Sequence, residues 1–177
     1  DNKHMNFLYN MADVTINIAS NEGWGLSTTE SLLTETPIIV NTTGGLQDQC
    51  GFKKDDGSYL TVDDYTTEWG SNHDGRYKEC GEWAKPVFPS SISLVGSIPT
   101  PYIFDDRCRW DDTADKIKEW YDVGDDERKR CGELGREYAF SEQAGMTAEM
   151  MCQGFIDKMD TAFSKWTPRN RYEIFKV

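Results

Sequence analysis

The stretch VTINIASNEGWGLSTTESLLTETPIIVNTTGGLQDQC, residues 14–50, decides the fold class of this chain. Over 14–19, β-branched residues alternate with small or polar ones, which is typical of a strand. A glycine turn, Glu-Gly-Trp-Gly, follows at 22–25. The next residues, about 26–34, have apolar positions at helical spacing and predict a short helix.

A second apolar segment completes this unit. Residues 38–40 are Ile-Ile-Val, apolar on both faces, as expected for a buried parallel strand. Residues 41–45 form a second glycine turn, and 46–50 are expected to start another short helix. A strand, a helix and a strand of these lengths predict a βαβ unit with a right-handed crossover.

The composition excludes several classes of function. The chain has 177 residues and suits one domain, or most of one. Its formal charge of -12 argues against a nucleic-acid binder, which needs cations to neutralise phosphates, and against attraction to an anionic membrane. We find no apolar run long enough to span a bilayer, so no transmembrane segment is expected.

The five cysteines are widely spaced and form no C-x-x-C pair, and the two histidines lie far apart in the sequence. This pattern favours reduced thiols in a cytoplasmic protein over a disulfide framework, and we expect no metal site. The first residues lack the charged start and apolar core of a signal peptide. They resemble the middle of a domain, so we expect the chain to be a fragment.

The flanking segments predict further elements. Residues 4–11 are expected to be helical. Residues 51–100 mix glycines, acids and aromatic residues without period, which predicts an insertion, partly mobile, with hairpin pieces at 59–62 and 92–95. Residues 101–104 are expected to form a last short strand.

Three C-terminal helices are predicted, over 111–123, 125–140 and 141–163. The first should turn one apolar face to the core, and the second should turn Cys131, Leu134 and Tyr138 inward. The Met and Phe residues of the third form a stripe that we expect to be core. The tail, 164–177, is expected to dock on another domain.

The two glycine turns lie where ligands bind in open α/β sheets, beyond the carboxyl ends of the strands. A helix that begins there gathers unpaired amides and binds phosphates, while Glu22 and Glu30 can accept hydrogen bonds from sugar hydroxyls. This describes a nucleotide-sugar site. The alternative interpretation is a tight turn with two solvated acids. Neither a G-x-G-x-x-G nor a G-x-x-x-x-G-K-S/T motif follows a strand.

Five sequence blocks, in this order and at this spacing, resemble the C-terminal domain of retaining GT-B glycosyltransferases, family 4 especially. The blocks lie at 9–14, 20–26, 30–32, 37–40 and 43–46. Seven residues separate Glu22 from Glu30, which matches the E-x7-E motif of that family. The resemblance is dense over about the first fifty residues, looser over 101–163 and absent over 51–100.

The resemblance implies an α/β fold with a Rossmann-like parallel sheet, part of the C-terminal domain of a GT-B fold, followed by C-terminal helices. Residues 1–163 would be a partial donor-binding domain with its insertion at 51–100. Glu22 would be the catalytic residue beside the donor sugar, and Glu30 would bind the ribose and therefore face inward. The other donor-binding positions would be Gly23, Trp24, Gly25, Leu26, Gly44 and Gly45.

The activity implied is transfer of a sugar, with retention, from a UDP- or GDP-linked donor to a glycan or another hydroxyl acceptor, without a metal or cofactor. The N-terminal GT-B domain, with the acceptor site and the Arg and Lys that bind the diphosphate, would precede residue 1, so this chain alone should be inactive. Two alternatives stay open: a non-catalytic GT-B-like scaffold or glycan-binding module, and an epimerase or phosphorylase of the same fold.

Overall fold

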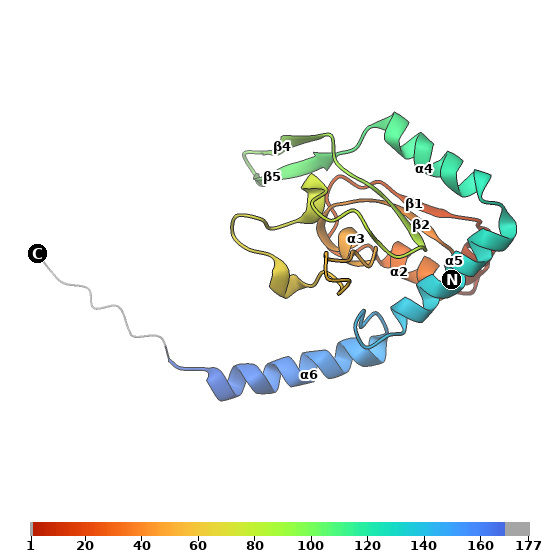
Figure 1. Cartoon of the computed structure of the whole chain (residues 1–177). Helices are drawn as coiled ribbons and strands as arrows, with labels where there is room; N and C mark the ends of the chain where they lie inside the picture. The colour runs from red at the N-terminus through yellow and green to blue at the C-terminus, as the bar shows by residue number, and fades with distance from the viewer. Residues whose placement is uncertain (1, 169–177) are drawn as a thin grey trace, which may run out of the picture.

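The computed structural model describes residues 2–168, and its centre is a parallel sheet of three strands in the order β1-β2-β3 (Figure 1). The strands are β1 (Thr15–Asn17), β2 (Ile38–Asn41) and β3 (Ala84–Val87). All four residues of the central strand β2 are buried. The prediction of an α/β fold with a parallel pair at the start of the chain is thus confirmed.

The helices predicted around the two glycine turns are present. α1 (Asn2–Met11) precedes β1, α2 (Leu26–Leu33) connects β1 to β2, and α3 (Gly44–Asp48) follows β2. Apolar side chains on one side of the sheet form the main core together with α2, α3 and α5. Its buried members are Leu32, Ile38, Val40, Leu46, Cys50, Phe52, Trp83, Ala84 and Ala139.

The buried face of α2 differs from the predicted one. Thr28, Ser31 and Leu32 are fully buried, whereas Leu26 is 70% exposed and Glu30 is exposed. The reason is the closeness of the helix to the sheet, since short hydroxyl side chains can pack there and bond to it. The Ser31 hydroxyl lies 2.7 Å from the Thr15 hydroxyl on β1. The inward orientation expected for Glu30 is therefore wrong.

The range 51–100 holds more regular structure than predicted, because β3 lies inside it and extends the main sheet. The short 3-10 helices η1 (Val62–Asp64) and η2 (Asn72–Asp74) also fall in this range. Its largest aromatic residues are packed: Trp83 is 5% exposed and Trp69 is 8% exposed. The sequence did not predict β3 because this strand is short and contains Pro86. Proline is disfavoured inside a sheet but tolerated at its edge, and β3 is an edge strand.

A separate antiparallel hairpin follows the sheet, formed by β4 (Ser91–Ser97) and β5 (Thr100–Arg107). It contains both the hairpin piece predicted at 92–95 and the strand predicted at 101–104. The other predicted piece, at 59–62, is reduced to one antiparallel bridge between Lys53 and Tyr59.

The C-terminal helices are α4 (Trp110–Asp122), α5 (Asp125–Ala139) and α6 (Ala148–Lys165). The spacing predicts an inward face of Ala114, Ile117, Trp120 and Tyr121 for α4. This is confirmed for Trp120, which is 2% exposed, and wrong for Tyr121, which is 79% exposed. α5 packs against α2, and its Cys131 is buried as predicted.

α6 projects away from the rest of the molecule (Figure 1), and none of its residues is buried. The prediction that its Met and Phe stripe is core is wrong for this chain, since Phe155 and Phe163 are exposed. Helical spacing shows which face of a helix is apolar but not what covers that face. The helix also begins later than predicted, at the Thr147 cap, whose hydroxyl accepts from the Met150 amide.

Two further predictions can be compared with the structure. All five cysteines are unpaired, as predicted. Within residues 2–168, no helix combines the length and the apolar character needed to cross a bilayer. The docking predicted for the tail lies mostly outside the described residues.

Candidate functional site

The two glycine turns pack against each other at the carboxyl ends of β1 and β2. The Gly45 amide donates to the Glu22 carbonyl oxygen at 3.2 Å. A Cβ added to Gly44 would lie 2.0 Å from that same carbonyl oxygen, and one added to Gly45 would lie 2.5 Å from the Gly23 carbonyl oxygen. Glycine is therefore required at 44 and 45 by the backbone of the first turn.

The glycines of the first turn differ from each other. Gly25, the N-cap of α2, has a φ of 85°, and a Cβ there would lie 2.4 Å from Leu46 Cδ2. Gly23 is exposed, and a Cβ built on it meets nothing within 4 Å. Of the four glycines predicted to bind the donor, Gly23 is therefore the one that borders open space.

The backbone amides of the first turn are free to bind a ligand. Among the described residues, none accepts a hydrogen bond from the amides of Gly23, Trp24, Gly25 or Leu26. The half-buried Glu22 carboxylate makes no hydrogen bond or ion pair within 2–168 either. Free amides at the start of α2 carry the positive end of the helix dipole, so they suit an anion, while Glu22 suits a hydroxyl donor.

A residue that the sequence analysis missed, Asp106 of β5, closes this edge of the sheet. Its carboxylate accepts from the Thr43 hydroxyl at 2.7 Å, and its amide donates to the Ser20 carbonyl oxygen at 2.8 Å. Nothing in the local sequence indicates that the hairpin folds back to this point. At the end of β2, Asn41 Oδ1 and Thr42 Oγ1 are buried without a partner among the described residues.

Glu30 lies apart from the glycine turns, in a cavity of about 290 Å³ between α1 and α2. The Tyr9 hydroxyl donates to its Oε2 atom at 2.8 Å. Burial and the neighbouring Glu30 carboxylate raise the pKa of Tyr9 to about 12. The exposed carboxylate remains accessible to a ligand, but its partner in the chain is a phenol of α1.

The Trp24 ring lies beside the second glycine turn, because a Cβ added to Gly45 would lie 3.1 Å from Trp24 Cε3. Its Nε1 donates to Thr29 Oγ1 at 2.9 Å, and the Thr29 hydroxyl bonds Gln49 Oε1 at 3.0 Å. The Gln49 side-chain Nε2 in turn donates to the Trp24 carbonyl oxygen at 2.5 Å. This closed chain of bonds fixes the turn, so Trp24 offers its backbone to the site and its ring to a neighbouring cavity.

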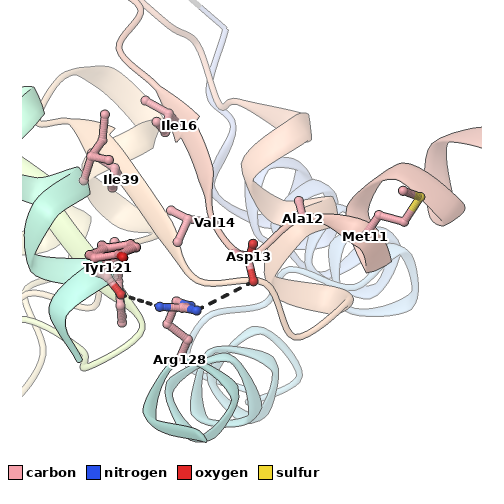
Figure 2. Close-up of a pocket in the computed structure, with 10 residues that line it drawn as sticks. Met11, Ala12, Asp13, Val14, Ile16, Ile39, Tyr121 and Arg128 are labelled. Atoms are coloured by element: carbon pink, nitrogen blue, oxygen red, sulfur yellow. Dashed lines mark hydrogen bonds and ion pairs between the residues drawn. The ribbon is translucent and has the colours of Figure 1, made fainter. Parts of the chain in front are cut away.

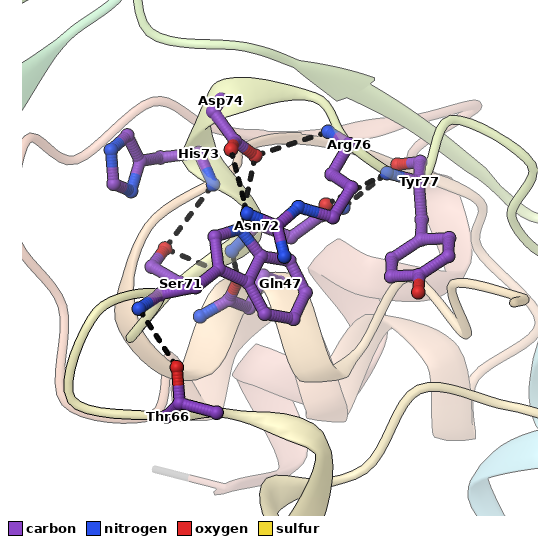
Figure 3. A network of polar contacts seen from close by, with 9 residues as sticks. Gln47, Thr66, Ser71, Asn72, His73, Asp74, Arg76 and Tyr77 are labelled. Atoms are coloured by element: carbon purple, nitrogen blue, oxygen red, sulfur yellow. Dashed lines mark hydrogen bonds and ion pairs between the residues drawn. The ribbon is translucent and has the colours of Figure 1, made fainter.

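A polar network holds the segment around η2 against α3, next to the second glycine turn (Figure 3). Gln47 is 5% exposed, and its Oε1 accepts from the Asn72 amide at 2.8 Å. Asn72 in turn bonds the backbone of Tyr77 through both ends of its side chain. The Arg76 guanidinium lies over the Trp69 ring, 4.1 Å from its centroid. The aromatic residues of this segment are thus used for packing.

A larger apolar cavity, of about 360 Å³, lies at the opposite, amino-terminal end of β1 (Figure 2). Ile16, Ile39 and Tyr121 contribute to its wall. Its polar feature is Arg128, which donates to the Trp120 carbonyl oxygen at 2.7 Å and lies 3.8 Å from the Asp13 carboxylate. None of the residues predicted to bind the donor lines this cavity.

One cluster has side chains of the types that bind metals: Glu82, Glu127 and Cys131. However, the Arg130 guanidinium bridges the two carboxylates, at 2.5 Å from Glu82 and 2.6 Å from Glu127. The cluster is therefore an ion-pair network that already balances the charge of the carboxylates.

Comparison of the sequence with protein-family models returns no match, and comparison with curated proteins returns none either. Arguments about function therefore rest on the residues and their geometry.

Proposed function

We propose that this chain is the donor-binding part of a retaining glycosyltransferase of the GT-B type, which moves a sugar from a nucleotide-sugar to a hydroxyl acceptor. The observation that carries the proposal is the row of free amides from Gly23 to Leu26, beside the unpaired Glu22 carboxylate. Amides at a helix start bind the diphosphate and stabilise it as the leaving group, and Glu22 accepts hydrogen bonds from the sugar.

The remaining predicted residues have unequal support. Gly44, Gly45 and Gly25 act through packing, because they allow the two turns to approach each other. Glu30 is proposed to bind the ribose, and its exposure leaves its carboxylate accessible to a diol. The diphosphate requires cations, and the groups that border the turns, Glu22 and Asp106, are acids. We therefore propose that the cations and the acceptor site come from a further domain, in a cytoplasmic enzyme.

In the glycan-binding alternative, the aromatic residues of the range 51–100 would form the surface on which sugars stack. Trp69 and Trp83, its largest rings, are almost fully buried. Trp83 stacks on Tyr138 with their ring centroids 4.5 Å apart. These rings are not available for stacking on a glycan, which favours the donor-binding proposal.

The proposal is tested by titrating the chain with UDP, GDP and their sugars, at up to millimolar concentration, while backbone amide resonances are followed by NMR. We expect shifts at residues 22–26. Gly23→Ala should weaken binding at least several-fold without changing the thermal midpoint, because the added Cβ enters open space. Gly154→Ala, at an equally open position in α6, is the matched control. If no nucleotide shifts these resonances, the proposal is wrong.

A further inference from the structure

A further cavity lies beside Trp24 and the end of α3. It has a volume of about 220 Å³ and lies between the end of α3, the segment before η1, and the end of α5 with the turn that follows it. Trp24, Leu60 and Tyr138 give it apolar and aromatic walls, and Asp48 is the carboxylate in its lining. The proposed donor site does not use it.

The walls of this cavity are held in place by contacts within the chain. Tyr138 donates from its hydroxyl to the Asp48 carbonyl oxygen at 3.1 Å, and its ring stacks on Trp83. Thr61 is fixed on the opposite wall, because Asp64 Oδ2 accepts from both its amide and its hydroxyl. A pocket that is already formed binds with less loss of conformational entropy than one that must be ordered.

The Asp48 carboxylate is the unusual feature of the cavity. It makes no hydrogen bond and no ion pair with any side chain or amide of the described residues. Burial raises its pKa to about 6. A half-buried carboxylate normally has a partner, because desolvation of an unpaired charge is costly.

The groups that face Asp48 do not compensate its charge. Burial raises the pKa values of Cys50, Tyr65 and Tyr138 above their ordinary values, so all three stay neutral near pH 7. Lys54 is already paired with Asp64 of η1 at 2.7 Å. This hydrogen bond and those from Thr61 lower the pKa of Asp64 to about 2. None of these groups titrates between pH 5 and 7, where Asp48 does.

We propose that this cavity binds a small organic cation, a primary amine whose ammonium group pairs with the Asp48 carboxylate and whose carbon body lies against the Trp24 and Tyr138 rings. An ammonium group supplies the positive charge that the carboxylate lacks, and aromatic walls attract cations through their ring faces. A sugar would offer hydroxyl hydrogen bonds but leave the carboxylate uncompensated. The cavity adjoins the proposed donor site at Trp24, but the carboxylate of Asp48 that carries this proposal belongs to the cavity alone.

The test uses n-butylammonium as the probe, with n-butanol and methyl glucoside as neutral probes of similar apolar or hydroxyl character. NMR follows the Asp48 amide and the Trp24 indole N–H of the full chain. We expect shifts with the amine only, and binding about tenfold weaker at pH 5 than at pH 7, because Asp48 becomes protonated. Nucleotides should leave the Asp48 amide signal unchanged.

Asp48→Asn keeps the shape of the side chain and removes its charge, so it should abolish amine binding while the protein still unfolds cooperatively. Asp55→Asn, at an exposed loop position, should leave binding unchanged. The proposal is overturned if butanol or the glucoside causes equal shifts, or if Asp48→Asn still binds the amine. It is also overturned if up to about 50 mM amine causes no shift, a concentration that is high for a weak millimolar site.

Discussion

Replacement of Asp48 by Asn should stabilise the chain near neutral pH, because it removes a carboxylate that folding desolvates without a partner. Burial raises its pKa from 3.8 to about 6. A shift of roughly two units corresponds to about 3 kcal/mol at about 1.4 kcal/mol per unit. Since the carboxylate is half-buried and retains some contact with water, we expect a gain of about 1–3 kcal/mol in the free energy of unfolding at pH 7.

The sign of the pH dependence follows from the direction of the shift. The folded chain holds the Asp48 proton more tightly than the unfolded chain does, so ionisation of this group costs stability. The cost is absent below about pH 4, grows as the pH rises towards about 6, and is constant above about pH 7. The difference between Asp48→Asn and the parent should therefore be small at pH 4 and complete at pH 7.

Urea unfolding, followed by far-UV circular dichroism at pH 4, 5, 6, 7 and 8, measures this difference, with Asp55→Asn as the control for loss of one exposed charge. The difference between the variant and the parent cancels the pH dependence of the other carboxylates. A difference that does not change with pH, or one that has the opposite sign at pH 7, would refute the reasoning.

Three further outcomes are expected. Gly132→Ala should lower the free energy of unfolding by more than about 2 kcal/mol, because its Cβ would lie 1.9 Å from a backbone carbonyl oxygen. Gly154→Ala, whose Cβ enters open space, should raise the free energy of unfolding by up to about 1 kcal/mol. Urea titrations of both variants measure this contrast. Tyr9 should ionise near pH 12 in a spectrophotometric or NMR titration, and Glu30→Gln should lower that pKa; an unchanged value would contradict the contact. Phe163→Ser should change the free energy of unfolding by less than about 0.5 kcal/mol, because the ring is 74% exposed; a cost typical of a core residue would show that α6 packs against the rest of the chain.

Local pattern was sufficient for the elements that begin and end on strong signals. The strand at 38–40, the helix after the first glycine turn and the parallel pairing of the first two strands were all predicted. Each depends on an apolar run or a helical spacing bounded by glycine or proline, which act within a few residues. The position of both glycine turns at the carboxyl ends of the strands was predicted as well, because parallel strands end at the same edge of a sheet.

Local pattern failed where burial depends on partners that are distant in sequence. The resemblance implied an inward Glu30, but Ser31 and Thr28 face the sheet because their short side chains allow close approach. Asp106 reaches the site only because the hairpin folds back onto β2, and Asp48 is desolvated by residues from η1 and α5. No spacing rule links these residues.

The sequence by itself determined the βαβ unit, the two glycine turns at the carboxyl ends of its strands, and the carboxylate that follows the first strand. Only the tertiary structure decided which of these groups border open space. The backbone of the first turn occupies the space beside Gly44 and Gly45, whereas Gly23 borders open space. The Glu30 carboxylate accepts a hydrogen bond from Tyr9. The physical reason is that turn geometry and apolar periodicity act along a few residues of chain, whereas burial and free space depend on the whole packed molecule.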